Sequence, residues 1–132
     1  MPEGVGYGPQ NTASVGKGLN IIGRYAYAYS GGISTNNNET DLLDFETGSE
    51  VLDSVVYCGT LTSTDDFRFV IYINGEASFF VQILASANYG MPRNATMPMV
   101  LPPFSNVRIT AQNTTDTTAH DACATVTGKI YK

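Results

Sequence analysis

The sequence has no tryptophan, one histidine and two cysteines among its 132 residues. The missing tryptophan removes the Cys-Trp-Cys signature of an immunoglobulin-like sandwich, which leaves that fold as the second choice. The two cysteines, Cys58 and Cys123, need not form a disulfide bond, since a domain of this size can be stable without one. Both lie in expected strands, where a free cysteine is most often a small buried hydrophobic residue.

Positive charge and long apolar runs are also scarce. Seven Lys and Arg residues against twelve Asp and Glu give a formal charge of −5, so the chain lacks the basic field that a nucleic-acid partner needs. No run approaches the roughly 18 apolar residues of a membrane helix. The first ten residues, MPEGVGYGPQ, have neither the basic start nor the apolar core of a secretory signal. We therefore expect a protein made in a reducing cytoplasm, with no nucleic-acid and no membrane partner.

No segment has the period of a helix, whereas 13 Gly and 8 Tyr residues and many Thr residues are typical of an all-β protein. The length corresponds to one domain with a core of its own. Residues 1–18 contain five Gly and two Pro residues without periodicity and predict an irregular arm, followed by a domain over residues 19–132. Alternation in that domain predicts eight strands, at residues 19–29, 40–47, 51–59, 66–73, 76–85, 97–101, 107–112 and 122–131.

The strongest local signal is Asn74-Gly75 between two apolar runs, which predicts a hairpin because both residues tolerate positive φ. A two-residue loop would place the apolar side chains of the two strands on opposite faces. A three-residue loop with a bulge at Gly75 pairs Tyr72 with Glu76. Burial favours this bulged register, which gives one apolar face: Phe67, Phe69, Ile71, Ala77, Phe79, Val81 and Ile83.

Rolling the chain up about this turn pairs strand four with five, three with six, two with seven and one with eight. This is the jelly roll, two packed four-stranded antiparallel sheets. The four connections that it gathers at one end are long and polar, and those at the other end are short. Function usually lies in such loops, so we expect contacts there from Asn37, Tyr89 and Arg93.

The second face of the hairpin is half apolar and carries Val70, Tyr72, Phe80 and Leu84. Such an apolar patch is rarely left exposed to solvent on a monomer. We expect it to be buried in a symmetric homo-oligomer, most simply a trimer, unless residues 1–18 fold back over it. In the arm itself, Val5, Tyr7 and Pro9 are the expected partner contacts.

Candidate chemistry is sparse. His120, next to Asp121, has no nucleophile in reach by sequence and is expected at the surface. The carboxylates of Asp41, Asp44 and Glu46, with Glu39 nearby, could seat Ca²⁺, but strand alternation favours an exposed acidic face. Asp65 and Asp66 are expected to stabilise a turn before the next strand. The sequence therefore predicts no catalytic residue, no metal site and no cofactor.

A further stripe, formed by Tyr25, Tyr27 and Tyr29, alternates with alanine. These rings could stack sugars or partners, or they could pack inward with the alanines facing solvent, because alternation alone does not identify the core face.

The segment VLPPFSNVRITAQN, the closing strand ATVTGKIY and the turn YINGE resemble small jelly-roll structural proteins of tailed-phage virions. The roll is also similar to tumour-necrosis-factor and complement C1q-like trimers. The resemblance implies a trimeric decoration or cement protein on a capsid surface, with arms that contact the major capsid protein or another virion protein.

We therefore expect a non-enzymatic virion protein that trimerises and binds a capsid lattice. Two alternatives stay open. One is a carbohydrate- or receptor-binding module that uses the polar loop end, and the other is a hydrolase with an acidic site.

Overall fold

The computed structural model describes residues 19–62, 64–84 and 94–131. Over these ranges the chain is all-β and contains no helix, and hence no helix long and apolar enough to cross a membrane. It forms ten strands: β1 (Asn20–Ile22), β2 (Tyr25–Tyr29), β3 (Ile33–Thr35), β4 (Thr40–Glu46), β5 (Val51–Thr60), β6 (Phe67–Ile73), β7 (Glu76–Ile83), β8 (Asn94–Leu101), β9 (Asn106–Asn113) and β10 (His120–Tyr131).

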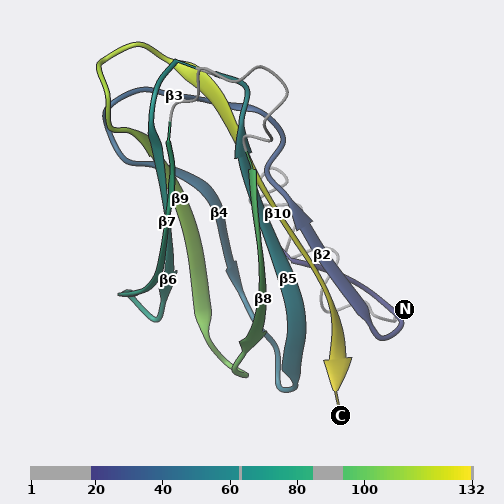
Figure 1. Ribbon diagram of the computed structural model, residues 1–132. Helices are drawn as coiled ribbons and strands as arrows, with labels where there is room; N and C mark the ends of the chain where they lie inside the picture. Colours follow the sequence, from purple (N-terminus) through teal and green to yellow (C-terminus); the bar gives the residue numbers. More distant parts are fainter. Residues whose placement is uncertain (1–18, 63, 85–93, 132) are drawn as a thin grey trace.

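The strands form two antiparallel sheets that lie face to face (Figure 1). One sheet has the order β1-β2-β10-β5-β8, with β3 also paired to β10, and the other has the order β4-β9-β6-β7. All four expected pairings are present: β6 with β7, β5 with β8, β4 with β9 and β2 with β10. The long β10 also pairs with β5, and β9 with β6, which joins these pairs into sheets.

The expected count of eight strands is wrong. The first expected strand is divided by Gly23, whose positive φ of 61° lets β1 fold back on β2. The second addition is β3, which lies in the expected loop after residue 29 and pairs Ile33 with Ala122 at the start of β10. Both additions are three residues long. β1 pairs with its neighbour β2, whereas β3 pairs with a strand far away in the sequence.

The hairpin register is correct in the faces of its strands and wrong in the place of its bulge. The loop has two residues, Asn74 and Gly75, both with positive φ, as in the twist-matched hairpin turns. The register shifts at Ser78 instead, between the pairs Tyr72↔Ala77 and Ile71↔Phe79. Beyond it, Phe79, Val81 and Ile83 share the face of Phe67, Phe69 and Ile71 as expected, whereas Ala77 lies on the opposite face.

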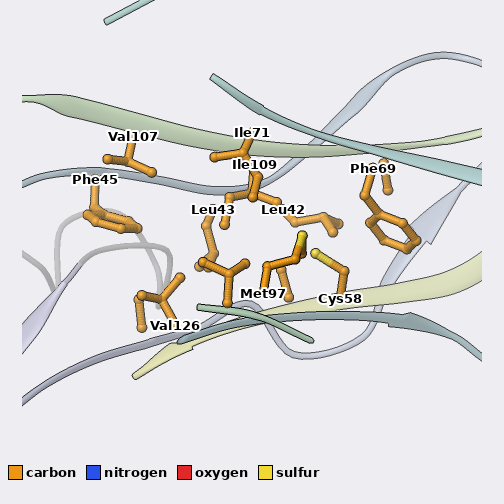
Figure 2. Close-up of a cluster of buried hydrophobic side chains, with 14 of the residues drawn as sticks. Leu42, Leu43, Phe45, Cys58, Phe69, Ile71, Met97, Val107, Ile109 and Val126 are labelled. Atoms are coloured by element: carbon orange, nitrogen blue, oxygen red, sulfur yellow. The ribbon is translucent and has the colours of Figure 1, made fainter. Parts of the chain in front are cut away.

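The core lies between the sheets, and Figure 2 shows side chains from both layers pointing toward one another. Phe69, Ile71 and Ile109 come from one sheet, and Cys58 and Val126 from the other. A register shift in β4 after Asp41 buries Leu42 and Leu43 together, although they are consecutive in the sequence. On β2, Ala26 and Ala28 point inward, so the tyrosines face outward.

Hydrogen bonds hold the connections together at each end. The short connections meet at one end, where the Phe104 amide donates to the Gly48 carbonyl and the Asn74 amide to the Asn106 carbonyl. At the other end the Leu61 amide donates to the Asp121 carbonyl and the Thr114 amide to the Asp66 carbonyl. The expected separation of short and long connections is therefore confirmed where the chain is described.

Candidate interaction surfaces

The outer face of the β4-β9-β6-β7 sheet carries a polar network. Arg108 donates to Asp41 at 2.8 Å, and its guanidinium lies 4.2 Å from the centre of the Tyr72 ring. The Tyr72 hydroxyl donates to Glu39 at 2.6 Å, and Thr110 donates to the same carboxylate oxygen. Partial burial raises the pKa of Glu39, but these two hydrogen bonds and the nearby arginines outweigh it and lower the pKa overall. Many polar groups of this face are therefore already paired with other groups of the same chain.

The network changes the expected oligomer patch. Val70 is only 5% exposed, and Tyr72 is half-buried beneath its polar partners. Phe80 and Leu84 are 65% and 64% exposed. The apolar surface that remains for a partner therefore lies at the sheet edge, on and just after β7.

The outer face of the other sheet is more apolar. We call it the aromatic face, and its side chains are Tyr25, Tyr27 and Tyr29 on β2, Thr125, Thr127, Lys129 and Tyr131 on β10, Val51, Asp53, Val55 and Tyr57 on β5, and Thr96, Pro98 and Val100 on β8. Tyr25 and Val100 are more than 60% exposed, and Tyr57 in the middle strand is 43% exposed. The Tyr27 and Tyr29 rings lie 5.1 Å apart. Lys129 and Asp53 sit opposite each other in register, so the face has little net charge.

In the described part of the chain, two open hollows lie on this face, and glycines contribute to the lining of both. One, of about 530 Å³, lies at the loop end and is lined by Tyr29, Gly59, Asn94, Asp121 and Cys123 among others. The other, of about 460 Å³, lies beside Gly128 and is lined by Tyr25, Asp53 and Val55 among others. A Cβ on Gly128 would lie 2.6 Å from the Asp53 carbonyl oxygen, so β10 and β5 approach closely there.

A buried polar cluster joins two loops at the long-loop end. Asp65 is 5% exposed and accepts hydrogen bonds from Asn113 at 2.8 Å and from His120 at 2.9 Å. The Asn113 side chain also donates to the Thr118 carbonyl and accepts from the Thr115 amide. The hydrogen bond from Asn113 is the largest influence on the pKa of Asp65 and, with that from His120, lowers it despite the cost of desolvation.

This cluster corrects two expectations. His120 is not a free surface histidine, because it is paired with Asp65 and lies against Phe67. The Asp65 side chain does more than shape a turn, because it ties the connection before β6 to the connection before β10. Its hydrogen bonds to Asn113 and His120 join the two connections, and it lines neither hollow of the aromatic face, which indicates a structural role.

The two cysteines are free and differ in environment. Cys58 lies in the core, where burial, with a smaller contribution from Cys123, raises the pKa of its thiol to about 12. Cys123 is exposed beside the larger hollow. They lie on adjacent strands but face opposite sides of one sheet, since Cys58 is opposite the inward Ala124. The expectation of burial is therefore right for Cys58 and wrong for Cys123.

Several expected contact residues, Val5, Tyr7, Pro9, Tyr89 and Arg93, fall outside the described residues. Asn37 is described and exposed, and its carbonyl accepts a hydrogen bond from Gln112. Of the acidic residues on β4, Asp44 and Glu46 are exposed as expected, and Asp41 pairs with Arg108. No group of three or more metal-ligating side chains occurs in the described ranges.

The aromatic face as a whole was not predicted from the sequence. One signal was present, because Val51, Val55 and Tyr57 alternate with the equally apolar Leu52, Val56 and Cys58. A strand that is apolar on both sides has one side in the core and offers the other to a partner.

No protein-family model and no curated protein sequence matches the chain. Several solved structures resemble it, and two of them have a TM-score above 0.5. One is a protein of Bacillus endospore appendages, described as a family of disulfide-linked pili, with a TM-score of 0.51 and 13% identity over 86% of this chain and 91% of that one. The other is VP2 of infectious bursal disease virus in a subviral particle, with a TM-score of 0.54 and 12% identity over 82% of this chain. The match spans 32% of the VP2 chain. At this identity the likeness concerns the fold, which is shared with structural proteins of a virus and of pili.

Proposed function

We propose that the protein is a non-enzymatic structural subunit of a virion, a capsid decoration or cement protein that forms a homotrimer and binds the capsid lattice. The strand orders β2-β10-β5-β8 and β4-β9-β6-β7 support a jelly-roll core, with β1 and β3 as additions. Two of its structural neighbours, a capsid protein and a pilus protein, support a role in assembly.

The aromatic face carries this proposal. It spreads exposed tyrosine, valine and proline side chains over four strands, with one Lys and one Asp opposite each other near its centre. Tyrosine-rich, charge-poor surfaces are typical of the centres of protein interfaces. We assign the trimer contact to this face and the lattice contact to residues 1–18.

The molar mass in solution tests the trimer. Size-exclusion chromatography with light scattering should give three times the chain mass of 14.2 kDa, or a multiple of that trimer mass where trimers associate further. Tyr57→Asp and Val100→Asp should each lower the trimer population, because a carboxylate is costly to bury in an apolar contact. Phe104→Asp is the matched control, since Phe104 is 78% exposed and lies in the β8–β9 connection. A monomeric wild-type protein at micromolar concentration would overturn the trimer.

Binding to particles tests the capsid role. The protein should be present in purified virus particles at a fixed ratio to the major capsid protein, and added protein should bind particles that lack it. Absence from particles together with failure to bind them would contradict a decoration role.

A carbohydrate- or receptor-binding module is the second candidate. The observation in its favour is the larger hollow, where Tyr29 stands beside Asn94 and Asp121. An aromatic ring next to hydrogen-bonding groups can bind the apolar and polar sides of a sugar. A signal on a glycan array that Tyr29→Ala abolishes and Tyr131→Ala leaves unchanged would favour it. A blank array would exclude sugar binding at this hollow.

A further inference from the structure

The four-stranded sheet ends in an edge that lacks the protection of the other edges. The second edge of the same sheet, β4, carries Asp41, Asp44 and Glu46. In the other sheet, β8 contains Pro98, and β1 and β3 have only three residues each. Charge, proline and shortness all prevent an edge strand from pairing with another chain. Residues 77–84 of β7 and just beyond have none of these features.

The side chains on β7 are apolar on both faces. On the inner face, Phe79 lies opposite the buried Ile71 but is itself 39% exposed, because the core is open at this edge. On the outer face, Phe80 and Leu84 are the exposed remainder of the hairpin patch. An added strand beside β7 would cover residues on both faces.

The free backbone groups can be identified. The Thr114 amide donates to the Asp66 carbonyl, so Asp66, and with it the even-numbered residues of β6, bonds toward β9. The odd-numbered residues of β6 then bond toward β7, because antiparallel ladders alternate. Their partners in the pairs Phe69↔Val81 and Ile71↔Phe79 are odd-numbered residues of β7, whose backbone groups therefore bond to β6. The amides and carbonyls of Phe80 and Gln82 therefore point to the free edge.

We propose that β7 is a docking edge for β7 of a second copy of this chain, paired antiparallel across a two-fold axis at Phe80. Residues 77–84 carry no charge, so an uncharged strand such as a second copy of β7 can pair with this edge without electrostatic repulsion. In an antiparallel pair centred on Phe80, the two Glu76 side chains lie far apart. Residues 1–18 are a poor occupant, because five Gly and two Pro residues disfavour a strand.

The side chains fit this self-pairing. With Phe80 opposite the partner's Phe80 and its amide facing the edge, the two-fold axis lies in a hydrogen-bonded pair. Phe79 then faces the partner's Val81 on the inner side, so the two cores meet across the contact. Ser78 faces the partner's Gln82 on the outer side. The two four-stranded sheets become one continuous sheet, and aromatic and aromatic–aliphatic cross-strand pairs stabilise it.

The contact goes beyond the proposed function, since a trimer through the aromatic face does not need it. The two contacts together give a dimer of trimers. Phe80→Lys places like charges on the two-fold axis. Gln82→Pro removes an edge-facing amide and leaves the β6 ladder intact, which is where an edge strand accepts proline. Both should halve the mass of the wild-type assembly, while Phe104→Lys should not change it.

The outcomes separate the two proposals. A dimeric wild type that Phe80→Lys makes monomeric supports the β7 contact and overturns the trimer. A trimeric wild type that neither β7 variant changes overturns the β7 contact alone. Amide hydrogen exchange gives a second measurement, because Phe80 and Gln82 should exchange slowly in the assembly and fast in Phe80→Lys. Fast exchange at both in the wild type, or protection that is lost only when residues 1–18 are deleted, would overturn pairing between copies.

Discussion

At the residue scale, Asp65 shows how a buried carboxylate is tolerated. Its oxygens accept from Asn113 and His120, so the charge is removed from water but not left without hydrogen bonds. The backbone carbonyl of Asp66, the next residue, accepts a hydrogen bond from the Thr114 amide. The two adjacent aspartates therefore act on different partners, which a turn propensity does not reveal.

We predict that Asp65 makes stability fall in acid. Its pKa is lower in the folded protein than the ordinary value of 3.8, so the stabilisation is complete above that value and is lost as the pH falls through the folded pKa. The urea midpoint of the wild type should therefore decrease between about pH 5 and pH 2. Asp65→Asn should be less stable at neutral pH and should show a smaller decrease in acid. Equal decreases in both proteins would mean that Asp65 carries no part of the pH dependence.

We also predict that the two thiols react at very different rates. Cys123 is exposed, whereas Cys58 is 1% exposed and its pKa is about 12, so the nucleophilic thiolate of Cys58 is rare at neutral pH. A maleimide or iodoacetamide should label one site in the native protein and two after unfolding. Cys123→Ser should leave the native protein unlabelled. Fast native labelling of Cys58 would contradict its place in the core.

At the element scale, the sequence correctly predicted which strands pair, but not how they end or bend. The alternation of apolar side chains determined which residues of the hairpin share a face, since the wrong parity would expose them. It did not determine the bulge at Ser78, because one extra residue anywhere between the turn and Phe79 gives the strand beyond it the same parity. Similarly, β3 has little pattern of its own and forms because β10 extends past β2 and offers it a partner.

We predict that the close approach of β10 and β5 at Gly128 does not tolerate a side chain. A Cβ there would lie 2.6 Å from the Asp53 carbonyl oxygen and 2.9 Å from Ser54 Cα, and the backbone would have to shift. Gly128→Ala should lower the free energy of unfolding by about 1–3 kcal/mol, as overpacking usually does. Gly32→Ala is the control, since its Cβ would only contact the Asp121 side chain at 3.7 Å. Chemical denaturation of both variants measures the difference, and equal stability would contradict it.

At the scale of the whole molecule, the outer surfaces differ in polarity. One outer face is polar and internally bonded, the other is apolar, and one of the sheet edges is unprotected. The larger apolar surface is on the sheet that does not contain the hairpin, although the hairpin patch was the expected interface. Polar partners from β4, β9 and the β3–β4 connection cover part of that patch, and none of them is near the hairpin in sequence.

We predict that residues 1–18 can be deleted without loss of the fold. The first described residue, Leu19, is already buried at 3% exposure and belongs to the core. The deleted protein should keep the β-sheet circular dichroism and a cooperative thermal transition, and it should bind capsids more weakly. Loss of folding on deletion would show that the domain begins earlier than residue 19.

The sequence by itself determined the eight main strands, their pairing about Asn74-Gly75 and the separation of short from long connections, because local turn chemistry and two-residue alternation act over a few residues. Only the tertiary structure decided which side of β2 faces the core, where Asp65, Asn113 and His120 meet, and which apolar surface stays open. These depend on neighbours brought together from distant parts of the chain. A stripe of tyrosine and alanine satisfies either orientation until the opposite sheet leaves space for alanine alone.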